Sequence, residues 1–102
     1  MKASRTDVVI LATAKASPGR EAELERALRE VAEPTRRQTG CVQFTLFREA
    51  RDRSTFVACE RWTSEEAHQQ HLAGAHVRLL MSRMAEVLAS PPSIISYEAI
   101  DE

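Results

Sequence analysis

The sequence has no excess of either charge. Its 102 residues include 14 Lys or Arg and 15 Asp or Glu, which gives a formal net charge of −1. A nucleic-acid-binding protein needs a strongly basic face. The densest arginine clusters, at positions 36–37 and 48–53, are short or diluted by acidic residues. The charge balance therefore argues against nucleic acid as a partner.

Long apolar runs and cysteines are also scarce. No stretch approaches the roughly 20 apolar residues of a membrane span, and no cleavage pattern follows the first apolar run. We therefore expect a cytoplasmic protein with no membrane partner. Cys41 and Cys59 suit a reducing compartment. If they lie on paired strands, an offset of about four positions is too long for a disulfide, so we expect two free, buried side chains.

Sequence motifs for cofactors and for common nucleophiles are missing. We find no glycine-rich nucleotide loop, no nucleophile elbow and no Cys–His pair at motif spacing. No cofactor is therefore implied. The length predicts a single domain over residues 1–102, large enough for a core but too small to enclose a deep ligand cavity easily. A second subunit would help to close one.

What the chain does contain is an alternation of strand and helix patterns. Apolar spacing predicts four strands and three helices. Ser17 is the expected cap of the first helix, and Pro34 is expected to end it near position 32 or 33. The expected strands are 7–15, 41–49, 54–62 and 93–100, and the expected helices are 17–33, 65–72 and 75–88.

A short polar segment at 50–53 predicts that the second and third strands form an antiparallel hairpin. In that pairing Phe44 lies opposite Glu60, and Val42 lies opposite Trp62. One face of the hairpin is then apolar with a single carboxylate in it. The members of this face are Val42, Phe44, Leu46, Ala58, Glu60 and Trp62.

The element order βαββαβ predicts an α+β, ferredoxin-like fold with a four-stranded antiparallel sheet. The helices cover one sheet face. The other face is also rich in apolar residues and needs a cover. A symmetric partner sheet would provide it, so we expect a homodimer.

The third strand and the segment after it carry a family resemblance. Thr63 and Glu66 have the spacing of a capping box. Four short stretches resemble the signature of the antibiotic biosynthesis monooxygenase domain: Glu60-Arg61-Trp62, Glu65-Glu66-Ala67, His71-Leu72 and His76-Val77. The resemblance runs from the first strand to Tyr97. It implies a dimeric α+β barrel, and family members include cofactor-free quinol monooxygenases and anthrone oxygenases.

Glu60 and Trp62 are the first candidate site residues. A carboxylate on an apolar sheet face has a raised pKa and suits a general base. The structural alternative is an ion pair with Arg61, Arg78 or an arginine of a partner subunit. Trp62 is either a stacking surface for a flat aromatic substrate, as the resemblance implies, or a core anchor.

The resemblance places His71 and His76 beside the pocket. There an imidazole can take a proton from a phenol or hold the developing phenolate. Alternatively, these side chains hold the break between the two helices. His68, three residues before His71, raises the alternative of a three-histidine metal site. No nearby cysteine or carboxylate completes that set, so we expect no metal.

The remaining candidates are aromatic. Phe44 stands where the family often has tyrosine, so a wall of the pocket is kept but a phenol donor is lost. Tyr97, the only tyrosine, is a candidate substrate contact. Haem-degrading relatives use an asparagine on the first strand. The complete absence of asparagine from this sequence argues against that activity.

The resemblance, together with these residues, implies a cofactor-independent monooxygenase that oxidises a quinol or polycyclic phenol with O₂. Its catalytic residues would be Glu60, His71 and His76, with Phe44, Trp62 and Tyr97 contacting the substrate. Two alternatives remain open. One is a non-oxidative isomerase on the same fold, and the other is a non-catalytic protein, stress-associated or binding an aromatic ligand.

Overall fold

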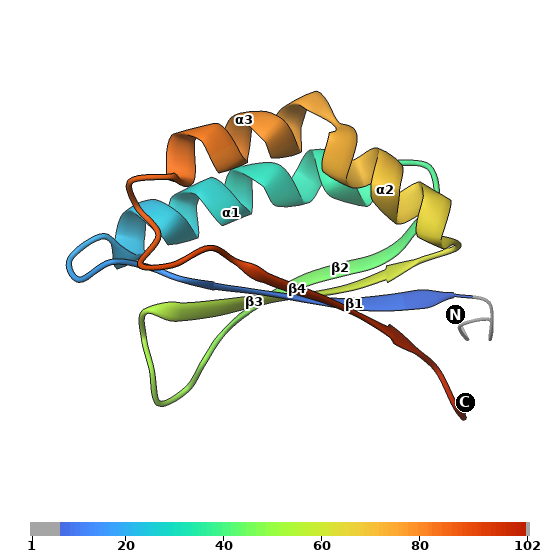
Figure 1. Cartoon of the computed structure of the whole chain (residues 1–102), viewed down its shortest axis with the longest axis horizontal. Coiled ribbons are helices and arrows are strands. Elements are labelled where there is room, and N and C mark those ends of the chain that lie inside the picture. Colours follow the sequence, from blue (N-terminus) through green and yellow to red (C-terminus); the bar gives the residue numbers. More distant parts are fainter. Residues whose placement is uncertain (1–6, 102) are drawn as a thin grey trace.

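The computed structural model of the chain describes residues 7–101. Positions 1–6 and 102 of the predicted domain lie outside the described residues. The strands pair antiparallel in the order β2-β3-β1-β4, and the helices cover one face of the sheet (Figure 1). This arrangement confirms the predicted α+β, ferredoxin-like fold. The elements are β1 Val8–Lys15, α1 Glu21–Arg36, β2 Cys41–Arg48, β3 Thr55–Trp62, α2 Glu65–Ala73, α3 Ala75–Met84 and β4 Ser93–Glu98.

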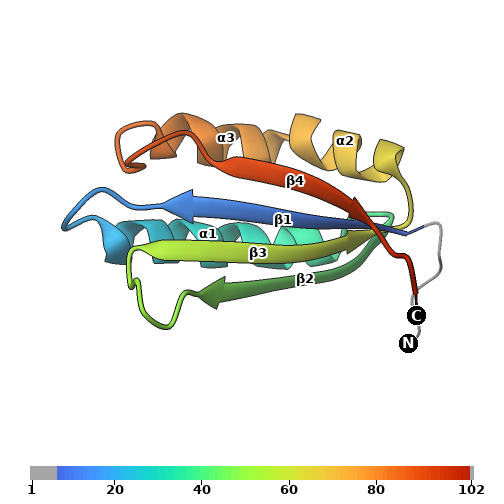
Figure 2. The ribbon, with the colours of Figure 1, turned by 60° about the horizontal axis from the view of Figure 1, so that its bottom comes forward.

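The two faces of the sheet have different surroundings, as Figures 1 and 2 show. Side chains alternate along each strand, and one set points toward the helices. There Phe44 and Ala58 form a core cluster with Val31 of α1 and Val77 of α3. A second cluster joins Phe56 of β3 to both long helices. The opposite face carries no element of the described chain.

The hairpin register is largely as predicted. Phe44 pairs with Glu60, but the predicted pairing of Val42 with Trp62 is wrong, because Cys41 faces Trp62 across an irregularity between Cys41 and Gln43. A bulge of this kind adds one residue to a strand. Past the bulge the register returns, so Phe44 and Glu60 still share the helix-facing side.

Both cysteines are free and half-buried, four positions apart along the β2–β3 ladder. Of the helices in the described part of the chain, none combines the length and the hydrophobicity that a membrane span requires.

Helix α1 continues through Pro34 to Arg36, so the predicted end near position 33 is wrong. A proline inside a helix removes one backbone hydrogen bond. Two contacts of the last turn offset that loss. The buried Thr35 hydroxyl donates to the Val31 carbonyl at 2.7 Å. Arg36 Nε donates to the Phe44 carbonyl of β2 at 3.0 Å. A bond within the last turn and a contact with β2 thus accompany the extension of the helix beyond the predicted end.

The N-terminal caps predicted for α1 and α2 are both wrong. Ser17 closes a turn by accepting the Arg20 N–H through its backbone carbonyl, and α1 has no side-chain cap. Ser64, one residue after Thr63, caps α2, and its hydroxyl accepts the Ala67 N–H at 3.1 Å. Both serine and threonine are good N-caps, and the extended backbone at Ser64 decides between them.

The last two elements are shorter than predicted. Helix α3 ends at Met84 rather than at position 88, and β4 ends at Glu98 rather than at position 100. After Met84, the Leu88 N–H donates to the Met84 carbonyl and closes a single turn that is not part of α3. The chain then crosses to β4, the edge strand beside β1.

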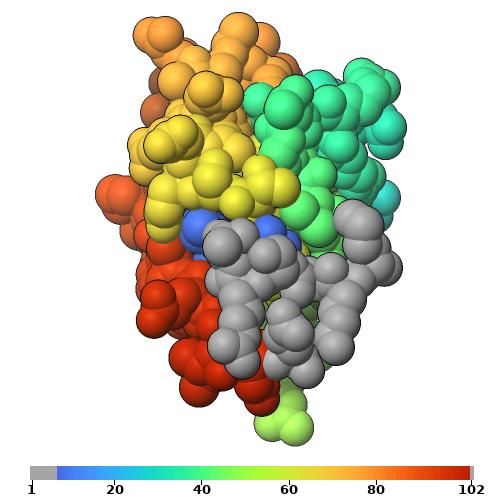
Figure 3. Space-filling model, turned by 90° about the vertical axis from the view of Figure 1, so that its right-hand side faces the viewer, coloured from blue at the N-terminus to red at the C-terminus, as the bar shows by residue number. Residues whose placement is uncertain are grey.

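Gly40 lies in the connection from α1 to β2 and packs against the start of α2. Its φ of +88° is a conformation that residues with a side chain rarely adopt. A Cβ at this position would lie 2.6 Å from Ala67 Cβ. The Gly40 carbonyl also accepts the Thr63 N–H at 2.8 Å. Figure 3 views this end of the molecule, where the α1–β2 connection (green) and α2 (yellow) lie side by side.

We predict that Gly40→Ala destabilises the protein by about 1–3 kcal/mol more than Gly19→Ala does. Gly19 is a matched control because its φ is +85° but no atom lies within 4 Å of the place that a Cβ would take there. The two variants share the backbone cost and differ in the clash with Ala67. Chemical denaturation measures the difference, and equal losses would contradict the close approach of α2.

Candidate functional site

A cavity of about 100 Å³ lies between the sheet and the helices. Its walls are mostly aliphatic and aromatic, and none of the described residues that line it is Lys or Arg. The titratable side chains in the lining are Glu60, His68 and His71. Its apolar walls are formed mainly by Ala12, Ala14, Leu24, Leu28, Val31, Phe44, Phe56, Ala58, Leu72, Val77, Leu80, Met81, Met84, Leu88, Pro92 and Ile94.

A more open groove of about 340 Å³ lies between α1 and the edge strand β2. Its arginines already have partners within the chain. Arg48 and Arg29 both pair with Glu25, and the Arg48 guanidinium lies 5.0 Å from the centre of the Phe56 ring. The buried cavity, which contains side chains with perturbed pKa values, is the stronger candidate site.

Glu60 lies in the middle of β3 and is only 4% exposed. Its Oε1 accepts a hydrogen bond from Trp62 Nε1 at 2.9 Å. Burial raises the pKa of Glu60 to about 7, and the hydrogen bond from Trp62 partly opposes that rise. Within residues 7–101, neither Arg61 nor Arg78 forms the predicted ion pair with this carboxyl. Glu60 is thus a carboxyl that changes charge near neutral pH.

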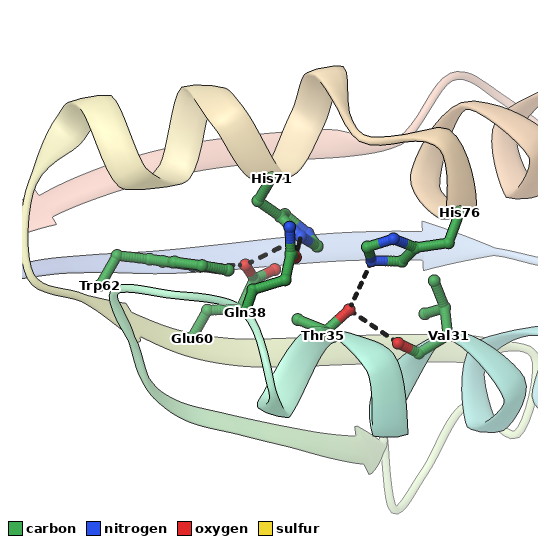
Figure 4. A network of polar contacts seen from close by, with 7 residues as sticks. All are labelled: Val31, Thr35, Gln38, Glu60, Trp62, His71 and His76. Carbon is green, nitrogen blue, oxygen red and sulfur yellow. Dashed lines mark hydrogen bonds and ion pairs between the residues drawn. The ribbon is translucent and has the colours of Figure 1, made fainter.

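His71 faces Glu60 from α2. Its Nδ1 lies 2.6 Å from Gln38 Oε1, and because an amide oxygen only accepts, Nδ1 carries the proton. The other nitrogen, Nε2, lies 4.0 Å from Glu60 Oε1 (Figure 4). Burial, together with smaller contributions from the neighbouring His68 and His76, lowers the pKa of His71 to about 4. His71 is therefore neutral at physiological pH, with its lone pair directed toward Glu60.

Trp62 and Phe44 both pack near the His71 ring. The Trp62 ring is fully buried, with its centre 4.7 Å from that of His71. It does not line the cavity, so in this conformation it holds Glu60 rather than offering a face to a ligand. Phe44 lines the cavity, and its ring centre lies 6.2 Å from that of His71.

His76 lies at the start of α3. The Thr35 hydroxyl donates to Val31, so it accepts from His76 Nε2 at 3.2 Å (Figure 4). The His76 ring centre lies 5.7 Å from that of His71, but His76 does not line the cavity. This position links α1 to the break between α2 and α3, as the structural alternative predicts.

Tyr97 lies away from the other candidates. It pairs with Val9 on the sheet face that the helices leave open, and it is 45% exposed. The cavity lies on the other side of the sheet. The prediction that Tyr97 contacts a substrate together with Glu60 therefore does not fit its position.

Sequence reasoning missed two residues of the site. Gln38, two residues after the end of α1, meets His71 across 33 positions of sequence, and no local signal marks it. His68 lines the cavity and is 3% exposed. Its spacing of three from His71 predicts the same helix face, but the sequence suggests only a metal-ligand role for it. Among the described residues, no group of three His, Cys, Asp or Glu is arranged to hold a metal ion.

We predict that Glu60 makes the protein less stable as the pH rises from about 4.5 to 7. The folded pKa of about 7 lies above the usual 4.5, so the folded state keeps a proton that the unfolded state has lost. The contribution of Glu60 to the free energy of unfolding is fully present below pH 4.5. It falls by roughly 3 kcal/mol by pH 7.5. Denaturation of Glu60→Gln and wild type across this range isolates the effect, and parallel curves would exclude the raised pKa.

Comparison with known proteins agrees with this fold and with the sequence motifs. Residues 7–83 match the profile of the family described as antibiotic biosynthesis monooxygenase. "Putative monooxygenase YcnE" of Bacillus subtilis (strain 168) is 26% identical over 91 residues, which cover 89% of this chain and 96% of that protein.

Two solved structures are also similar. PA3566 from Pseudomonas aeruginosa has a TM-score of 0.89 at 27% identity, covering 94% of this chain and 96% of that one. Rv0793 from Mycobacterium tuberculosis has a TM-score of 0.88 at 26% identity, covering 94% and 97%. Because the family profile matches most of the sequence, the chain belongs to the antibiotic biosynthesis monooxygenase family.

Proposed function

We propose that the protein is a cofactor-independent monooxygenase that oxidises a quinol or polycyclic phenol with O₂. The observation that carries the proposal is the buried Glu60 carboxyl. It lines an apolar cavity, and its pKa is raised to about 7. A general base works best when its pKa lies near the working pH. Glu60 meets that condition, whereas the pKa of His71, about 4, makes it a weak base.

In the proposed reaction Glu60 takes the proton of a phenolic hydroxyl. The resulting phenolate is electron-rich and supplies the electrons that reduce O₂. One oxygen atom enters the ring and the other leaves as water, so a 1,4-quinol becomes a hydroxyquinone. The substrate provides all the electrons, and no further reductant is required. The protein contributes a base, an apolar enclosure and a means of orienting the ring.

The other residues have supporting roles in this proposal. Phe44 forms an aromatic wall of the cavity. Trp62 fixes the Glu60 carboxyl through its indole N–H. His71, held by Gln38, offers a hydrogen-bond acceptor beside Glu60. His76 holds the α2–α3 junction through Thr35, and in this way positions His71.

The size of the cavity favours the smaller of the proposed substrates. Pockets for drug-sized ligands measure about 300–1,000 Å³, and an engineered 150 Å³ cavity admits benzene. At about 100 Å³, the cavity suits a single-ring quinol after a small outward shift of its walls. A polycyclic phenol would need a larger displacement of α3 or β4, which supply Met81 and Ile94 to the lining.

We predict that Glu60→Gln lowers kcat for quinol oxidation about 100-fold or more, because it removes the base. Oxygen uptake by metal-stripped protein, measured against a panel of quinols and anthrone-like phenols, tests this. Wild-type kcat should rise as the pH increases through about 7, because the Glu60 carboxyl then loses its proton and can act as a base. The exposed Glu49→Gln serves as the charge-matched control.

Uptake above autoxidation that is equal in wild type and Glu60→Gln would exclude Glu60 as the base. Turnover of a small carbonyl compound without O₂ would favour the isomerase. Stoichiometric binding without any product would favour the non-catalytic protein.

We also propose that the protein is cytoplasmic, because its two free cysteines would remain reduced there.

We also propose that the open sheet face forms a homodimer. This face carries Phe47, Ile95 and Tyr97, each about half exposed, around Val9 and Leu11 of the central strand β1. A concentrated apolar patch of this kind marks an interaction surface. A second copy offers a matching sheet, because a two-fold interface joins the same patch on both subunits.

We predict that Ile95→Lys weakens this dimer at least 30-fold, which corresponds to about 2 kcal/mol, because it places a charge in the apolar patch. Sedimentation velocity over a dilution series measures the change. Leu79→Lys is the control, because Leu79 is 58% exposed on α3, away from the sheet. A wild-type monomer at high concentration, or equal effects of both substitutions, would contradict the proposed interface.

A further inference from the structure

His68 is a buried polar side chain that has no polar partner. It lies on α2 with 3% of its surface exposed and lines the cavity beside Glu60 and His71. Neither of its ring nitrogens has a hydrogen-bond partner among the described residues, and both are shielded from solvent. The great majority of buried polar groups in proteins are hydrogen-bonded. An unpaired imidazole in a cavity wall therefore calls for an explanation.

The other two histidines show how this chain normally satisfies such a group. His71 is bound to Gln38, and His76 to Thr35. His68 instead packs against two rings, with its centre 6.0 Å from that of Trp62 and 6.1 Å from that of His71. Ring packing fixes its orientation and leaves its hydrogen-bonding capacity unused. That capacity is available to a molecule in the cavity.

The chemistry of the cavity limits what that molecule is. Burial lowers the pKa of His68, which keeps the imidazole neutral with one donor and one acceptor. No Lys or Arg lines the cavity, so a carboxylate or phosphate would be buried without a counter-charge. A hydroxyl group both donates and accepts, so it can pair with either nitrogen of His68. The apolar walls suit the ring that carries the hydroxyl.

We infer that His68 binds a hydroxyl group of an uncharged aromatic ligand in the cavity and so selects phenols over aromatic hydrocarbons of the same shape. The inference rests on the proposed function for the location of the ligand and does not require turnover. His68 is then a specificity-determining residue, distinct from the base at Glu60. A quinol, with two hydroxyls on one ring, would use both positions.

The test compares the affinities of phenol and toluene for the full-length protein, measured by calorimetry in the absence of O₂. Wild type should prefer phenol. His68→Leu should reduce the phenol-to-toluene affinity ratio about tenfold, because one buried hydrogen bond is lost. His68→Gln keeps a donor and an acceptor and should retain most of the preference. An unchanged ratio in His68→Leu, or no binding of either compound to wild type, would overturn the inference.

A second measurement needs no substitution. The ring nitrogen resonances of His68 in the labelled wild-type protein should shift on addition of phenol and stay in place on addition of toluene. Equal responses to both compounds would count against a hydroxyl contact. These results are separable from those on the proposed function, because the oxygen-uptake assay can fail while phenol selectivity holds, and the reverse is equally observable.

Discussion

The removal of the Glu60 carboxyl from water is the constraint on which the site depends. An ionised carboxylate is costly to bury without a counter-charge, and no arginine or lysine of the described chain reaches it. Its burial raises the pKa to about 7 instead. Trp62 supplies a hydrogen bond, and His71 supplies a neutral ring nitrogen at 4.0 Å. The surroundings thus leave Glu60 able to gain or lose a proton near neutral pH.

That environment exists only because α2 lies close against the end of the sheet. Gly40 permits the close approach, since any side chain there would meet Ala67. Gln38, two residues earlier, binds His71 and sets its tautomer. The connection from α1 to β2 therefore both places α2 and orients its central histidine. This connection, 33 positions before His71 in sequence, thus fixes the orientation of that side chain beside Glu60.

The two faces of the sheet carry different sets of residues. The helix-facing side holds the core, the cavity and the titratable residues, and the open side presents apolar side chains around β1. Strand alternation assigns each residue to one face. Tyr97 and Glu60 are therefore separated by the sheet, although both lie on strands that pair with β1. Glu60 therefore lines the cavity, whereas Tyr97 does not.

Much of the fold followed from the sequence alone, because local periodicity encodes both the type of each element and the face on which a residue lies. The pairing of Phe44 with Glu60, the apolar face around them and the position of His71 on a short helix were all predictable in this way. The bulge at Val42, the continuation of α1 past Pro34 and the choice of Ser64 as cap depend on contacts outside the local pattern. Only the tertiary structure decided which histidines find partners, since Gln38 and Thr35 come from 33 and 41 positions away. The tertiary structure also decided that His68 is unpaired in the cavity wall and that Trp62 donates a hydrogen bond to the Glu60 carboxyl. Burial and hydrogen bonding are properties of the packed chain, so no local pattern predicts them.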